Sequence, residues 1–180
     1  MTRSWTTKIE SSAPVPICIG LGSNLGSSEA TLQNAIQQLA RFLGHPRVGP
    51  LVETTPVPES DQPDYLNTVL LGTASISPEE FLSVAKRLEW DAGRRQSARF
   101  AARVLDIDIL LWGDRVIETP ELSIPHPRLR SRRFVLAPLV EVAPNLRIPP
   151  DNQTVRALLD RLGDDQRVRP RPWSTPPLQS

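Results

Sequence analysis

The stretch VLDIDILLW, residues 104–112, is the segment around which the rest of this chain is arranged. Seven of its nine residues are apolar, which predicts a strand buried on both faces. Side chains alternate between the two faces of a strand, so Asp106 and Asp108 are expected to point the same way. The residues expected to point the opposite way, into a core, are Leu105, Ile107, Ile109 and Leu111.

Two acids on an apolar strand need a cationic partner, because an unpaired carboxylate is costly to bury. Magnesium is one such partner, since it binds carboxylate oxygens and keeps other positions for water or phosphate. Structural ion pairs and exposure to solvent are the alternatives, and the strand alone leaves them open. Basic residues flank the strand and favour a polyphosphate site. They are Arg94, Arg95, Arg99 and Arg103 upstream, and His126, Arg128, Arg130, Arg132 and Arg133 downstream.

The length of 180 residues predicts one domain, over residues 15–162. Disordered tails are expected over residues 1–14 and over residues 163–180, which are rich in Pro and Arg. The net charge of +1 argues against a general attraction to nucleic acid or to a membrane. Cys18 is the only cysteine, which excludes a disulfide within the chain. The sequence shows neither a membrane span nor a signal peptide, so a cytoplasmic protein is expected.

The predicted elements follow the order β-α-β-β-α-β. Strands are expected over residues 15–21, 47–54, 65–74 and 104–112. One helix is expected from Ser27 or Ser28 to Gly44, and another from the cap Ser77 to Gly93. This order predicts an α+β fold with a ferredoxin-like core, in which helices pack on an antiparallel sheet. A short hairpin strand at residues 115–117 and helices at residues 131–142 and 154–162 are expected to follow.

Three further features have more than one interpretation. Residues 20–26, GLGSNLG, lack the Lys-Ser/Thr pair of a phosphate loop and favour a strand-to-helix turn. His126 fits a hydrogen bond to phosphate or a structural hydrogen bond, whereas zinc is improbable because His45 is the only other histidine. Tyr65 and Asn67 share a strand face that could hold a planar heterocycle, although the rings of Tyr65 and Phe134 also fit core packing.

Four motifs stand in order between about residue 17 and residue 150. They are GLGSNLG, DQPDYLN, LDIDILLWG and IPHPRLRSRRFVLAPLVEVAP. Together they resemble the 6-hydroxymethyl-7,8-dihydropterin pyrophosphokinase family. The resemblance implies transfer of the terminal pyrophosphate of ATP to the hydroxymethyl group of the pterin, with release of AMP, in folate biosynthesis. ATP and the pterin are then the substrates of a monomeric enzyme that binds no nucleic acid.

The resemblance also implies roles for single residues. Asp106 and Asp108 would hold two magnesium ions, and Arg94 and Arg103 would assist catalysis beside them. The pterin would be bound by Tyr65, Asn67 and Phe134. The ATP site would be formed by Glu89, Arg103, Ile109, His126 and Arg132. Loops over residues 54–64 and 94–103 would close over the substrates, and a role of Asp106 in removing the hydroxyl proton is left open.

The chain departs from the family pattern in one loop. Ala101 and Ala102 stand where the family usually has Gly-Pro, and Gln96 replaces a frequent arginine. Closure of this loop is therefore expected to be weaker or slower. Two other classes of protein share parts of the pattern. A different metal-dependent nucleotidyltransferase would also use paired aspartates, and an RNA-binding module would share the order of elements. The module's third strand is normally basic and aromatic, whereas residues 65–74 contain one aromatic residue and no Arg or Lys.

Overall fold

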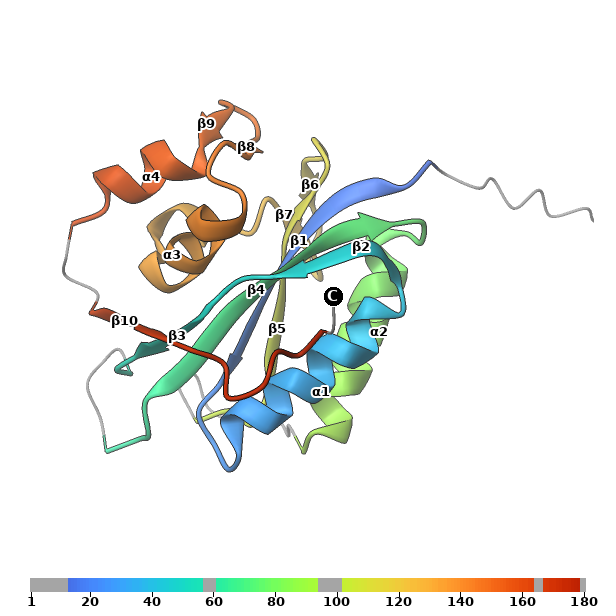
Figure 1. The fold of residues 1–180 in the computed structure, drawn as a ribbon. Helices are drawn as coiled ribbons and strands as arrows, with labels where there is room; N and C mark the ends of the chain where they lie inside the picture. Colours follow the sequence, from blue (N-terminus) through green and yellow to red (C-terminus); the bar gives the residue numbers. More distant parts are fainter. Residues whose placement is uncertain (1–12, 57–60, 94–101, 164–166, 179–180) are drawn as a thin grey trace, which may run out of the picture.

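The structure is a computed structural model that describes residues 13–56, 61–93, 102–163 and 167–178. A six-stranded sheet lies at its centre, with helices on both faces (Figure 1). The strand order is β10-β3-β4-β1-β5, with β2 also beside β4, and every neighbouring pair is antiparallel. The strands of this sheet are β1 Val15–Ser23, β2 Leu43–Val48, β3 Leu51–Thr54, β4 Tyr65–Ala74, β5 Asp106–Trp112 and β10 Val168–Arg171.

Helices α1 (Ser28–Ala40) and α2 (Pro78–Asp91) cover one face of the sheet. A capping box fixes the start of α2, because Ser77 and Glu80 each accept a hydrogen bond from the other's backbone N–H. The apolar faces of both helices join the sheet in one core, in which Ile36 and Phe81 are fully buried. This arrangement confirms the predicted α+β fold with a ferredoxin-like order of elements.

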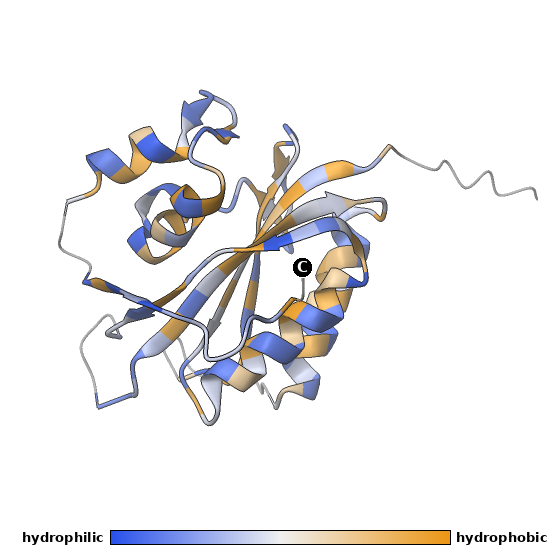
Figure 2. Cartoon of the chain, in the orientation of Figure 1, coloured by the Kyte–Doolittle hydropathy of each residue, from blue (hydrophilic) through white to orange (hydrophobic). Residues whose placement is uncertain are grey.

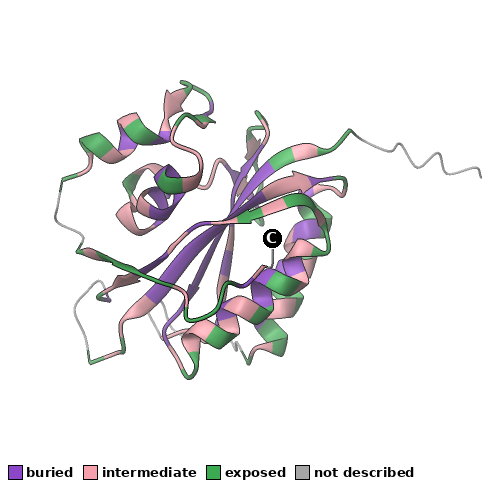
Figure 3. Cartoon of the chain, in the orientation of Figure 1, coloured by how far each residue is buried: buried purple, intermediate pink, exposed green. Residues whose placement is uncertain are grey.

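Helix α3 (Arg133–Val142), which follows a short 3-10 turn, η1 Leu129–Ser131, covers part of the other face, and helix α4 (Val155–Arg161) packs against α3 (Figure 1). Their apolar residues form a second core with the sheet, and Figures 2 and 3 show apolar, buried residues along the contact. Cys18 lies in this core, where burial raises the pKa of its thiol to about 12. Two small hairpins complete the fold. β6 Ile117–Glu118 with β7 Ser123–Ile124 lies beside β5, and β8 Arg147–Ile148 with β9 Gln153–Thr154 stands between α3 and α4 in the chain.

Two predicted boundaries are wrong. Helix α1 ends at Ala40, and Gly44 lies in β2, where it faces Thr73 of β4. The strand expected over residues 47–54 is two strands, β2 and β3, which both pair with β4. Gly49 and Pro50 separate them. Proline has no N–H for the ladder, so continuous pairing is interrupted there.

The C-terminal residues also differ from expectation. A disordered tail was predicted from residue 163 onward, yet Val168–Arg171 form β10 at the edge of the central sheet. Residues 1–12, the larger part of the predicted N-terminal tail, lie outside the described residues. Among the described residues, no helix is long and apolar enough to cross a membrane.

Candidate active site on strand β5

Asp106 and Asp108 project from the same face of β5. They stand opposite Gly22 and Gly20 of β1, and their side chains keep 25% and 32% of their surface exposed. Ile107 between them is buried in the core under α1 and α2. The carboxylates therefore lie on the side of the sheet where α3 packs, and alternation along the strand places them together.

This alternation stops at a β-bulge. The register between β1 and β5 shifts between Cys18 and Ile19, which leaves Leu110 as the extra residue. Leu111 consequently joins Leu110 in the core under α3 and α4. The prediction that Leu111 shares a face with Ile109 is wrong, because strict alternation holds only for a regular strand.

Two glycines of β1 leave the surface beside the carboxylates free of side chains. Gly22 lies between Asn67 of β4 and Asp106 of β5, in one row across three strands. A Cβ atom on Gly22 would lie 2.8 Å from Asn67 Oδ1, so glycine is required for the present position of that amide. Gly20 occupies the same position in the next row, opposite Asp108. Both glycines lie within β1, whereas the predicted strand ended at residue 21 and left Gly22 in the turn.

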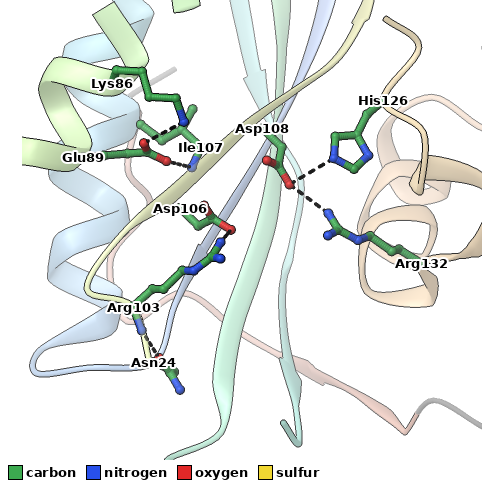
Figure 4. Close-up of polar contacts among 9 residues, drawn as sticks. All are labelled: Asn24, Lys86, Glu89, Arg103, Asp106, Ile107, Asp108, His126 and Arg132. Carbon is green, nitrogen blue, oxygen red and sulfur yellow. Dashed lines mark hydrogen bonds and ion pairs between the residues drawn. The ribbon is translucent and has the colours of Figure 1, made fainter. Parts of the chain in front are cut away.

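Arg103 forms an ion pair with Asp106, with 2.6 Å between Nη1 and Oδ2 (Figure 4). Burial lowers the pKa of this guanidinium, but the charge and hydrogen bond of Asp106 outweigh burial and raise it overall. Asn24 holds the backbone of Arg103 from both sides: its Oδ1 accepts from Arg103 N at 2.7 Å, and its N–H donates to Arg103 O at 3.0 Å. Asn24 also donates to Pro63 O at 3.1 Å, so it joins the segments on either side of the site. The sequence placed Asn24 only in a strand-to-helix turn and predicted no contact between Asn24 and the site, although it is a polar residue directly after a buried strand.

Arg132 and His126 converge on Asp108 from the α3 side. Arg132 Nη1 lies 2.8 Å from Asp108 Oδ2, and His126 Nε2 lies 3.7 Å from the same oxygen (Figure 4). His126 Nδ1 accepts a hydrogen bond from Arg128 N at 3.1 Å, so in the neutral ring the proton belongs on Nε2, toward Asp108. Burial lowers the pKa of His126 although Asp108 acts to raise it, and the neutral donor is therefore favoured.

Tyr65, Asn67 and Phe134 lie around the carboxylates. Asn67 is 7% exposed, and its Nδ2 donates to Thr54 Oγ1 at 3.0 Å. Partial burial raises the pKa of Tyr65, while nearby Arg103 lowers it and nearby Asp106 raises it. Phe134 is the second residue of α3, and the guanidinium of Arg132 lies 5.4 Å from the centre of its ring. Tyr65 and Asn67 therefore adjoin Asp106, whereas Phe134 adjoins the residue that pairs with Asp108.

Glu89 and Ile109 mark the open edge of β5. Glu89 is 2% exposed, and its Oε1 accepts from Ile107 N at 2.8 Å, while Oε2 pairs with Lys86 at 3.1 Å (Figure 4). The Ile107 N–H consequently points away from β1. By the alternation of an antiparallel ladder, Ile109 turns its backbone N–H and C=O toward the same edge. Glu89 thus supports the strand, and Ile109 offers backbone groups beside it.

Other predicted arginines lie elsewhere. Arg130 donates to the carbonyls of Ile148 and Pro149 and pairs with Asp151, so it fixes the β8–β9 hairpin. Arg133 donates to Leu162 O at 3.3 Å. Arg94, Arg95 and Arg99 lie outside the described residues, as do residues 57–60 of the first predicted loop.

The carboxylate pair fits a hard divalent cation. Among the described residues, no group of three or more His, Cys, Asp or Glu side chains could hold a metal ion. Two carboxylates on one face therefore leave most of a coordination sphere to other oxygens, an arrangement that suits magnesium bound together with a phosphate chain. Each carboxylate already has a cationic guanidinium beside it, which indicates that positive charge is accepted at both positions.

Comparison with known proteins agrees with this geometry. Residues 18–144 match the profile of the family described as 7,8-dihydro-6-hydroxymethylpterin-pyrophosphokinase (HPPK). A 2-amino-4-hydroxy-6-hydroxymethyldihydropteridine pyrophosphokinase of Haemophilus influenzae is 33% identical over 156 residues, which cover 86% of this chain and 97% of that protein. The enzyme of the same name from Aquifex aeolicus is 37% identical over 130 residues, which cover 72% of this chain and 81% of that protein.

Larger proteins contain the same unit. The mitochondrial folate synthesis bifunctional protein of Arabidopsis thaliana is 41% identical over 140 residues, 77% of this chain but only 25% of that protein. A crystal structure of a triple mutant of Plasmodium falciparum HPPK-DHPS with pteroate has the same fold, with a TM-score of 0.67 at 16% identity. That match covers 85% of this chain and 44% of the other. The chain belongs to the 7,8-dihydro-6-hydroxymethylpterin-pyrophosphokinase family.

Proposed function

We propose that Asp106 and Asp108 hold two magnesium ions with ATP while this chain transfers pyrophosphate to the pterin. The family reaction moves pyrophosphate from ATP to hydroxymethyldihydropterin in folate synthesis, and the chain is an enzyme of this class. One observation carries the assignment of the site. The two carboxylates share one face of β5, and Gly22, which has no side chain, is the only residue between Asp106 and Asn67 in their row across the sheet.

The two arginines and the magnesium ions held by the carboxylates would both neutralise the negative charge of the phosphates. Magnesium held by Asp106 and Asp108 would offset the negative charge of the phosphates and polarise their oxygens. Arg103 and Arg132 reach the carboxylates from opposite sides, so they can turn to phosphate oxygens that arrive between them. Transfer of this kind depends on positioning and charge more than on covalent participation of the protein. Removal of the hydroxyl proton by Asp106 stays a prediction.

The pterin site lies at the Asp106 end of the carboxylate pair. Asn67 has an amide that can both donate and accept, as the edge of a pterin ring requires. Tyr65 and Phe134 provide aromatic faces on the two sides of the carboxylates. This position would bring the hydroxymethyl group of the pterin toward Asp106, where the phosphates meet it.

The nucleotide site extends from Asp108 to the open edge of β5. His126 presents Nε2–H as a neutral donor for a phosphate oxygen. Ile109 offers backbone groups with which a nucleotide base could pair along the edge. Glu89 contributes by holding the neighbouring Ile107, and its carboxylate is already engaged in that contact. The role implied for Arg94 stays a prediction.

A single assay tests the function. AMP is expected to form from ATP only when 6-hydroxymethyl-7,8-dihydropterin is added, and Asp106→Asn and Asp108→Asn should each lower the rate by several orders of magnitude. Asp114→Asn is the matched control, because Asp114 is an exposed acid just beyond the end of β5. AMP formation without the pterin would contradict the reaction. A near-normal rate in either β5 variant at saturating magnesium would contradict the metal assignment.

Two further expectations concern the setting of the enzyme. A monomer is proposed as the active unit. Analytical ultracentrifugation under assay conditions should therefore show an active monomer. The cytoplasmic location predicted from the sequence stays a prediction.

A further inference from the structure

The C-terminal residues 168–178, here called the C-terminal strap, connect the edge of the sheet to helix α1. Strand β10 pairs with β3 from Val168 opposite Thr54 to Arg171 opposite Leu51. Beyond β10, Trp173 Nε1 donates to Gly49 O at 3.2 Å, just before β3 begins. Figure 1 shows the strap running from β3 across to α1.

The far end of the strap is fastened to α1. The backbone N–H of Ser174 donates to Glu29 Oε1 at 2.6 Å, and its hydroxyl lies 3.0 Å from Oε2. Gln33 Nε2 donates to Thr175 O at 2.7 Å. The ring of Trp173 packs against the core under α1 and α2. The strap therefore pairs with the outer side of β3 and is anchored on a separate element, α1.

Strand β3 in turn positions a residue of the proposed pterin site. Thr54, the last residue of β3, accepts the hydrogen bond from Asn67 Nδ2 at 3.0 Å. Without β10, the four-residue β3 would be an edge strand with one row of unpaired backbone groups. A short edge strand opens more readily than a central one. The position of the Asn67 amide thus depends on a strand that the strap holds in place.

We propose that the C-terminal strap positions Asn67 through Thr54 and thereby sets the affinity for the pterin and not for the nucleotide. The inference rests on the proposed function, since it takes Asn67 as a pterin ligand. The strap lies outside residues 18–144, the segment that matches the family. Thr54 and Trp173 act as positioning residues, because each acts through another residue.

Variants of the full chain separate the two halves of the site. Thr54→Val removes the acceptor for Asn67 and should weaken pterin binding about 3- to 10-fold, the effect of one lost hydrogen bond. Thr54→Ser keeps a hydroxyl and should restore binding. Pterin affinity is measured by calorimetry in the presence of a non-hydrolysable ATP analogue, and the affinity for the analogue alone should stay unchanged.

The strap is tested by Trp173→Ala, with Ser174→Ala as the control that removes one hydroxyl from the contact to α1 and keeps the backbone hydrogen bond to Glu29. Trp173→Ala should speed amide hydrogen exchange in Leu51–Thr54 and weaken pterin binding, while Ser174→Ala should do neither. Equal losses of pterin and nucleotide affinity, or faster exchange with unchanged pterin affinity, would overturn the proposal. Failure of the wild-type chain to bind the pterin would instead contradict the proposed function. The hydrogen-exchange data would still decide whether the strap holds β3.

Discussion

Replacing Arg132 by Met is expected to tighten the binding of a divalent cation to the free protein and at the same time to slow turnover. Arg132 Nη1 lies 2.8 Å from Asp108 Oδ2, so a cation that uses this carboxylate must displace the guanidinium. Turnover should fall because the same guanidinium is proposed to contact phosphate. The two effects have opposite signs, which a general loss of structure would not produce.

The size of the first effect follows from the burial of the pair. The side chains are 15% and 32% exposed, so the interaction is stronger than a fully exposed ion pair but still screened by solvent. A charge-assisted hydrogen bond in such a place contributes about 1–2 kcal/mol. Its removal should tighten cation binding about 5- to 30-fold. Turnover should fall by less than it does in the variants of Asp106 and Asp108.

Binding is measured with Mn²⁺ as the probe, by electron paramagnetic resonance of the free ion in the absence of nucleotide. Arg115→Met is the matched control, since it removes the same charge at an exposed position beyond the end of β5. Arg132→Lys should lie between the wild type and Arg132→Met. Unchanged or weaker Mn²⁺ binding in Arg132→Met, or equal tightening in Arg115→Met, would refute the reasoning.

Three other expectations follow from single contacts. Gly22→Ala places a Cβ atom 2.8 Å from Asn67 Oδ1, so the KM for the pterin should rise about tenfold while the KM for ATP stays unchanged. An unchanged KM for the pterin would contradict the role given to Gly22 beside Asn67. Burial holds the pKa of His126 below 6.5, so the unfolded chain binds more protons and the Tm should fall as the pH drops below 6.5. Calorimetry of His126→Gln should show a weaker pH dependence. Glu89→Gln should weaken the hydrogen bond from Ile107 N–H by about 1 kcal/mol and lower the Tm by about 2–4 °C. A Tm equal to that of the wild type would show that the charge of Glu89 is dispensable for stability.

The parts of the fold that were predictable are those specified by neighbouring residues. The start of α2 follows from Ser77, Pro78 and Glu80, which lie within one helical turn. Strand β10 could not be found in this way, because the four residues VRPR contain only one that favours a strand, Val168. Its pairing depends on β3, more than a hundred residues earlier in the chain, and Pro170 is tolerated because β10 is an edge strand.

The site shows the same division. Asp106 and Asp108 were predictable because their spacing alone places them on one face. The local sequence did not distinguish the arginines, because nothing around residues 128–133 separates a guanidinium that reaches an acid from one that reaches a carbonyl. Only the family resemblance singled out Arg132. Arg132 meets Asp108, whereas Arg130 meets the carbonyls of a hairpin and Asp151. Only the path of the chain through η1 into α3 separates them.

The pairing of each aspartate with one arginine has a consequence for the order of binding. With Arg103 on Asp106 and Arg132 on Asp108, the formal charges of the four side chains cancel. A divalent cation alone would leave excess positive charge there, and a nucleotide alone would leave excess negative charge. Cation and nucleotide together preserve the balance, because the arginines can then move from the carboxylates to the phosphates. Cation and nucleotide should therefore strengthen each other's binding by the same factor, as linkage requires.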